Sequence, residues 1–174
     1  MTVPESIHQP SAPADATSVL PAENRAALVR ELGAMYAELD GVIAAANPLC
    51  RTSGDCCQFV KYGHRLYATK AEAVYFALRR GWPQEAFEKD ACPYLRDNRC
   101  TARHARPLGC RVFFCDPAWR GKGEDLTERF LRRIGALSER LGIERDYRPF
   151  LEHLDTFRTS QAPAGDHGEA SWPS

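Results

Sequence analysis

The stretch 92-CPYLRDNRCTARHARPLGCRVFFC-115 lacks a regular apolar period, yet it holds most of the chain's cysteines. The others lie upstream in the segment 50-CRTSGDCC-57. Together the two segments contain all seven cysteines of the chain: Cys50, Cys56, Cys57, Cys92, Cys100, Cys110 and Cys115. A cysteine that serves only as a small apolar residue is expected inside a periodic helix, whereas these lie in turn-rich sequence near Pro, Gly, Asp or Arg. Such loops let several sulfurs face one centre, so the pattern predicts that all seven cysteines bind metal.

Helical periodicity flanks this centre on both sides. Apolar residues at helical spacing predict a long helix over Glu23–Asn47 and another over Glu124–Leu141. A capping-box pattern predicts a helix over Thr69–Arg80, followed by a short one over Pro83–Asp90. A last helix is predicted over Tyr147–Phe157.

The segment Gln58–Ala68 is the one stretch that favours extended structure, because aromatic and β-branched residues surround a glycine there. The predicted fold class is therefore mainly α with a small irregular or β-hairpin segment, the helices being wrapped around the cysteine-rich metal-binding centre. One domain is expected over residues 21–158. The tails 1–20 and 159–174 are rich in Pro, Ala and Ser and are predicted to be disordered.

Length and charge exclude several classes of function. The chain has 174 residues, of which 44% are hydrophobic, which suits a single domain. Its 23 Lys and Arg residues balance 23 Asp and Glu residues, so nucleic acid is not expected as a partner. No apolar run approaches the length of a membrane span, and the N-terminus lacks a signal-peptide pattern. We expect a cytoplasmic protein without membrane contact, and an unknown protein partner remains open.

The number and spacing of the cysteines exclude some kinds of cysteine site. An odd number of cysteines leaves one over in any fully intramolecular disulfide scheme. The downstream cysteines lack the paired C-x2-4-C knuckles of simple zinc fingers, and they match neither ferredoxin spacing. Thiolate-rich sites select zinc or iron–sulfur clusters, and both cofactors stay open at this point.

The order of three motifs resembles a known bacterial family. The motifs are 50-CRTSGDCC-57, 92-CPYLRDNRC-100 and 106-RPLGCRVFFC-115. They resemble the CxxCxxCC cysteine-cluster proteins, described as a zinc- or iron-chelating domain. The resemblance implies metal chelation without implying a reaction. Ser53 stands where the family has its second cysteine, so two completely filled four-cysteine centres are not expected, and Phe114 replaces the usual proline before the last cysteine.

Arginines are concentrated around the downstream cysteines. Four thiolates around Zn²⁺ or an oxidised cubane cluster carry a formal charge of −2, which guanidinium groups would offset. Arg106 and Arg111, which flank Cys110, are the predicted cofactor-binding residues. His64 and His104 are weaker candidates for nitrogen ligands, because a soft site with seven sulfurs has little need of imidazole.

Three functions are compatible with these patterns. The favoured hypothesis is a metal-chelating protein that holds an iron–sulfur cluster with a redox, sensing or accessory role. The alternative is a zinc-binding structural or interaction module, in which the ion cross-links loops. A remote alternative is a thiol enzyme with a cysteine nucleophile, for which no motif supplies the base.

Overall fold

The computed structural model describes residues 20–160. The predicted tails 1–20 and 159–174 lie outside the described residues, apart from residues 20, 159 and 160. The chain forms helices α1 (Ala22–Ala46), α2 (Lys70–Arg80), α3 (Leu108–Val112), α4 (Arg120–Arg140) and α5 (Phe150–Thr159). Its strands are β1 (Tyr67–Thr69), β2 (Leu95–Arg96), β3 (Arg99–Cys100) and β4 (Tyr147–Pro149). Short 3-10 turns occur at Asp55–Cys57, Arg103–Ala105 and Pro117–Trp119. The mainly helical fold class is thereby confirmed.

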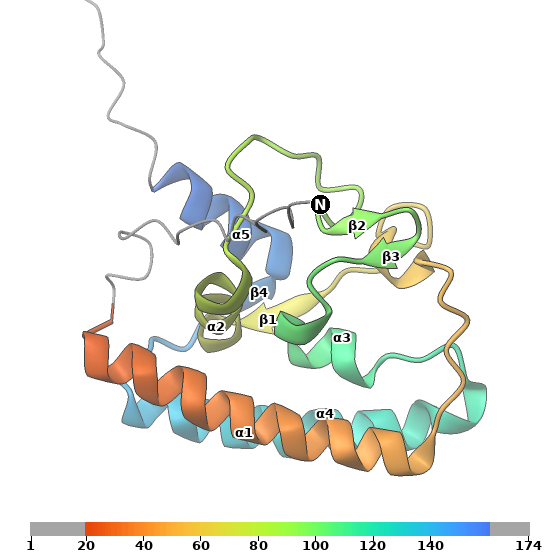
Figure 1. Ribbon diagram of the computed structural model, residues 1–174, viewed down its shortest axis with the longest axis horizontal. Helices are drawn as coiled ribbons and strands as arrows, with labels where there is room; N and C mark the ends of the chain where they lie inside the picture. The colour runs from red at the N-terminus through yellow and green to blue at the C-terminus, as the bar shows by residue number, and fades with distance from the viewer. Residues whose placement is uncertain (1–19, 161–174) are drawn as a thin grey trace, which may run out of the picture.

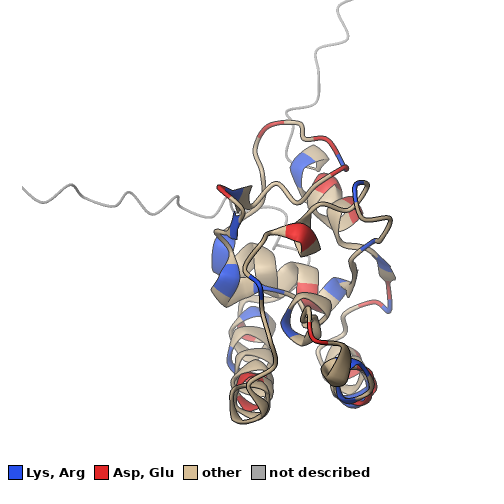
Figure 2. Cartoon of the chain, turned by 90° about the vertical axis from the view of Figure 1, so that its right-hand side faces the viewer, with Lys and Arg blue, Asp and Glu red and all other residues tan. Residues whose placement is uncertain are grey.

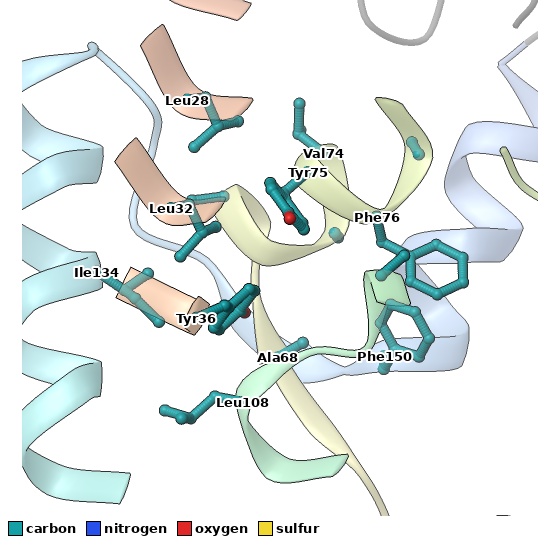
Figure 3. Close-up of a cluster of buried hydrophobic side chains, with 14 of the residues drawn as sticks. Leu28, Leu32, Tyr36, Ala68, Val74, Tyr75, Phe76, Leu108, Ile134 and Phe150 are labelled. Carbon is teal, nitrogen blue, oxygen red and sulfur yellow. The ribbon is translucent and has the colours of Figure 1, made fainter. Parts of the chain in front are cut away.

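Helices α1 and α4 form the base of the molecule. They lie side by side and run in opposite directions, while α2, α5 and the strands lie on one side of this pair (Figure 1). Each places an apolar stripe toward the centre, where residues of α1 and α4 meet residues of α2, α3 and α5 (Figure 3). The side chains of Leu32, Phe130 and Leu154 are completely buried in this core. Burial of apolar surface at helical spacing therefore holds the layers together.

The segment before α2 differs from the predicted local hairpin. Strand β1 pairs antiparallel with β4, with Ala68 opposite Arg148, and residues 59–63 form turns. The partner of β1 thus comes from a region that was predicted to be helical, and α5 begins only at Phe150. A strand whose partner lies some eighty residues away leaves no local turn signal, which explains why the sequence pattern failed here.

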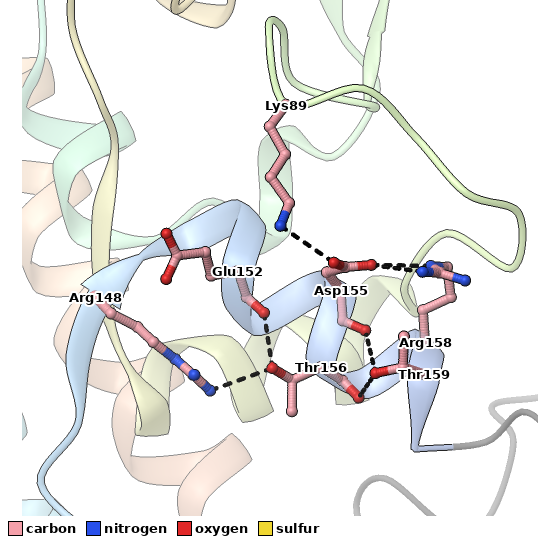
Figure 4. A network of polar contacts seen from close by, with 7 residues as sticks. All are labelled: Lys89, Arg148, Glu152, Asp155, Thr156, Arg158 and Thr159. Atoms are coloured by element: carbon pink, nitrogen blue, oxygen red, sulfur yellow. Dashed lines mark hydrogen bonds and ion pairs between the residues drawn. The ribbon is translucent and has the colours of Figure 1, made fainter.

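The segment after α2 is also not helical, contrary to the helix predicted over Pro83–Asp90. It runs as an irregular loop over α5 and is held there by an ion pair of 3.2 Å between Lys89 and Asp155. Asp155 also accepts hydrogen bonds from Arg158, so its carboxylate is fixed on the α5 side (Figure 4). Tertiary contacts therefore replace helical hydrogen bonds in this loop.

The cysteine-rich region contains a tight hairpin that the sequence pattern did not predict. Strands β2 and β3 are joined by Asp97 and Asn98, whose φ angles of 48° and 59° are both positive. Two residues with positive φ are typical of a type I′ turn, in which Asp and Asn are favoured. The cysteines are accordingly not confined to loops, since Cys100 lies in β3 and Cys110 lies in α3.

Charged residues are distributed over many elements, and both signs occur along α4 (Figure 2). Within residues 20–160, none of the helices combines the length and the apolar character that crossing a membrane requires.

Candidate metal centre

All seven cysteines line one cavity of about 300 Å³. The cavity lies between the segment that follows α1, the β2–β3 hairpin and α3. Seven cysteines that are spread over 66 residues of sequence thus meet around a single space. Apolar and aromatic side chains complete the wall: Phe59, Leu66, Phe76, Tyr94, Phe113, Phe114 and Phe150.

Backbone hydrogen bonds join the two cysteine-bearing segments. The N–H of Cys92 donates to the carbonyl of Cys57 over 2.8 Å. The N–H of Leu95 then donates to the carbonyl of Cys92 over 3.0 Å, and Leu95 pairs with Cys100 in the hairpin. Main-chain hydrogen bonds therefore link three cysteines that come from the two cysteine-bearing segments.

Gly54 lets the two segments pack closely. It has a φ of 75°, and a Cβ at this position would lie 2.9 Å from both Cα and the carbonyl oxygen of Asn98. The upstream segment therefore rests directly against the backbone of the hairpin turn, which leaves no room for a side chain.

We expect Gly54→Ala to lower the free energy of unfolding by about 1–2 kcal/mol for the positive φ and by a further 1–3 kcal/mol, roughly, for overpacking against the hairpin. Gly63→Ala is the matched control, because Gly63 has a φ of 63° with nothing within 4 Å of the added Cβ. Urea unfolding of both variants measures the difference. Equal destabilisation would show that the close approach of Gly54 to Asn98 has no energetic weight.

Interactions between thiols connect five of the cysteines, which we call the inner group: Cys56, Cys57, Cys92, Cys100 and Cys110. A hydrogen bond with Cys56 lowers the pKa of the Cys57 thiol, but a hydrogen bond with Cys92 and burial outweigh it and raise that pKa to about 12. The pKa of Cys56 is raised by its hydrogen bond with Cys57 and by burial. Burial raises the pKa of Cys110 above its usual range, and the thiols of Cys57 and Cys100 add to this effect. Without a cation, these three thiols stay protonated at neutral pH.

The cavity has a positively charged wall. Arg99, Arg103 and Arg106 line it, and the described lining residues include neither aspartate nor glutamate. Burial lowers the pKa of Arg106, and the neighbouring thiols of Cys110 and Cys100 act in the opposite direction. This wall would favour a negatively charged group in the cavity, such as a thiolate-bound metal centre.

Arg111, the other predicted cofactor-binding residue, is not among the residues that line the cavity. It is 3% exposed, and its guanidinium donates to Asp40 on α1 and to the carbonyl oxygens of His104 and Arg106. The structure therefore places Arg111 behind the cavity wall, where it supports the segment that carries Arg106.

The two candidate histidine ligands also lie outside the cavity lining. His64 Nε2 lies 3.2 Å from the carbonyl oxygen of Cys56, and its ring is stacked on Phe113. His104 Nε2 lies 3.3 Å from the carbonyl oxygen of Arg79. Each imidazole is thus engaged with the backbone of a neighbouring segment.

The sulfurs surround a volume instead of touching one point. In the part of the chain that the structure describes, no group of three or more His, Cys, Asp or Glu side chains is placed to hold a single metal ion directly. Tetrahedral zinc needs four sulfurs at about 2.3 Å from the ion. The donor set itself, soft thiols beside guanidinium groups, fits zinc or an iron–sulfur cluster in its chemistry.

Fold and cavity together define a small, mainly helical protein with a cysteine-lined, arginine-bearing cavity. A scan against models of protein families gives no match, and searches among curated proteins and among solved structures give none either. The resemblance to the CxxCxxCC proteins thus rests on the three sequence motifs.

Proposed function

We propose that this chain is a metal-chelating protein of the CxxCxxCC type, which holds an iron–sulfur cluster among the inner thiols and serves a redox, sensing or accessory role. The observation that carries the proposal is the convergence of all seven cysteines on one cavity. A packing role would not bring every cysteine of a chain to one space, because isolated buried cysteines need no sulfur neighbours.

The size of the cavity favours a cluster over a single ion. A volume of about 300 Å³ exceeds what one ion between touching sulfurs requires. A cluster spreads its thiolate ligands over several irons, so the sulfurs can stand further apart. Arg99, Arg103 and Arg106 would offset its negative charge, and for iron they would raise the reduction potential.

A zinc module is the second candidate, and the contacts of Cys57 favour it. Its thiol interacts with those of both Cys56 and Cys92, so part of the inner group is already compact. An ion bound there would cross-link the segment after α1 to the hairpin segment, and its binding free energy would add to that of folding.

The test is purification without oxygen, followed by analysis of iron, sulfide and zinc and by a visible absorption spectrum. We expect about four irons per chain with matching sulfide; about one zinc and no colour would select the zinc module. Cys57→Ser, Cys100→Ser and Cys110→Ser should each lose the metal together with much stability. Ser53→Ala is the control, because Ser53 lines the cavity without supplying sulfur. A folded, metal-free protein with seven titratable thiols would falsify the proposal.

A further inference from the structure

The cysteine cavity opens to the surface beside exposed apolar side chains. Cys50 and Cys56 line the cavity and are themselves exposed, so its opening lies at the segment that follows α1. Phe113, which belongs to the same lining, is 54% exposed. Large hydrophobic side chains are exposed at six positions of residues 20–160, and four of these belong to the chain segments that border the opening: Leu49, Val60, Tyr62 and Phe113. Apolar surface gathered in one place marks a site of interaction.

Contacts between side chains join these segments into one surface. The His64 ring is stacked on Phe113 with the ring centroids 6.3 Å apart, and His64 Nε2 lies 3.2 Å from the carbonyl oxygen of Cys56. The Tyr62 hydroxyl donates to Asp55 Oδ1 over 2.7 Å, directly beside Cys56. The chain after α1, the β2–β3 hairpin and the chain after α3 lie at the same end of the molecule (Figure 1).

Basic side chains surround the opening. Five of them are exposed in residues 51–65 and 99–103, namely Arg51, Lys61, Arg65, Arg99 and Arg103. None of the ion pairs within residues 20–160 involves any of the five. Arginines of α4 are paired, in contrast, as in the contacts of Arg133 with Glu38 and of Arg140 with Glu31. We call the surface formed by the four apolar side chains and these five basic ones the opening face.

Three aspartates lie among these residues and distinguish between kinds of partner. Asp55 accepts from Tyr62, Asp116 accepts from the N–H of Leu49 and from a second backbone N–H, and Asp97 is exposed in the hairpin turn. Their carboxylates would repel the phosphates of a nucleic acid, whereas a protein can place a donor opposite each of them. A second copy of this chain would bring the same excess of positive charge to the contact. An acidic protein therefore fits the opening face best.

We propose that the opening face is the docking surface for a small acidic electron-transfer protein. The inference rests on the proposed function in one respect, that a redox-active metal centre lies in the cavity behind this face. Electron-transfer complexes bury little surface and depend on opposite charges for rapid association. The partner would surround its redox group with carboxylates and place apolar atoms against Leu49 and Phe113. It would exchange one electron with the centre there, with no covalent bond formed or broken.

The test measures how the protein, purified without oxygen, binds two acidic electron carriers and a basic one. The acidic carriers are a plant-type ferredoxin and a flavodoxin, and the basic one is cytochrome c. We expect both acidic carriers to bind, with a dissociation constant that rises about tenfold or more from low to physiological ionic strength, and we expect no binding of cytochrome c. Titration calorimetry measures the constants, and iron analysis of the same samples follows the metal centre.

Charge reversal locates the contact. Arg51→Glu combined with Lys61→Glu changes two residues that do not line the cavity, so the metal content should stay the same while both acidic carriers bind about tenfold more weakly or worse. Arg129→Glu combined with Arg132→Glu is the matched control, because both arginines are exposed on α4 and the net charge changes equally. This control should weaken binding about twofold at most. Leu49→Ser should weaken binding severalfold at every ionic strength, since it removes apolar contact without altering charge.

Each other outcome has a defined meaning. If neither acidic carrier binds, if cytochrome c binds equally well, or if the two charge-reversed proteins behave alike, the inference is wrong. Tighter binding of a single-stranded RNA oligonucleotide, or a dimer that charge reversal at residues 51 and 61 dissociates, would also overturn it. A metal-loaded protein that binds neither carrier overturns the inference and leaves the proposed function intact. A metal-free protein that binds both carriers through this face would overturn the proposed function and keep the docking surface.

Discussion

Glu72→Gln should lower the free energy of unfolding by about 3 kcal/mol or more, since it impairs a buried carboxylate that joins three helices. Glu72 is 1% exposed, and its two oxygens accept four hydrogen bonds. The donors are the N–H and hydroxyl of Thr69 at 2.8 and 2.9 Å, the Tyr36 hydroxyl at 3.0 Å and the Leu108 N–H at 2.7 Å. A glutamine amide turns one oxygen into a donor, which leaves two of these donors facing an N–H group.

If the chain holds a metal centre as proposed, the same substitution should weaken its retention. Leu108 is the first residue of α3, the helix that carries Cys110 into the cavity. If the Leu108 N–H loses its acceptor on residue 72, the start of that helix loses an anchor to α2. We therefore expect faster loss of metal to a chelator in Glu72→Gln than in the unmodified protein.

Two variants isolate the cause. Glu144→Gln removes a carboxylate from an exposed ion pair with Lys70 and should cost about 0–1 kcal/mol. Tyr36→Phe removes one of the four donors and should cost about 1 kcal/mol. Urea unfolding measures all three, and a Glu72→Gln protein as stable as Glu144→Gln would show that the buried carboxylate contributes no more than an exposed one.

Of the hydrogen bonds of Glu72, those within its own helix turn were predictable from the sequence and those to distant segments were not. The capping box between Thr69 and Glu72 was predicted from their spacing and is confirmed, because both partners lie within one turn. The bonds from Tyr36 and Leu108 join residues 36 positions away on either side, which no local pattern encodes. The long helices α1 and α4 were predicted for the same reason as the cap, because their apolar period repeats within each element.

The sequence predicted which cysteines share one site, but it did not predict how they contact one another. Turn-rich sequence around every cysteine favoured a common centre, and all seven line one cavity. The arrangement of the cysteines depends on contacts such as the backbone hydrogen bond from Cys92 to Cys57, which arise only when distant segments meet. Arg106 and Arg111 look alike in sequence, yet only Arg106 lines the cavity.

Arg111 should prove to be a structural residue, and Arg111→Met should lower the free energy of unfolding by about 2–4 kcal/mol. Its guanidinium donates to Asp40 Oδ2 over 2.6 Å and to the carbonyls of Arg106 and His104 over 2.8 Å each. It also lies 4.1 Å from the centre of the Tyr36 ring, a cation–π contact in a buried setting. Methionine fills the space of the stem but leaves both carbonyls without these donors.

Arg111→Lys separates the effect of the positive charge from that of the planar arrangement of guanidinium donors. Lysine keeps the positive charge but cannot reach two carbonyls and a carboxylate in one plane, so we expect it to recover less than half of the lost stability. Asp40→Asn tests the ion pair alone: the Asp40 side chain is 51% exposed, and the amide oxygen of asparagine can still accept from the buried Arg111, so the change should cost about 1–2 kcal/mol. If Asp40→Asn proved as harmful as Arg111→Met, the ion pair would carry the stability. If Arg111→Lys were fully stable, charge alone would suffice, and the planar fork that holds the carbonyls of residues 104 and 106 would have no role.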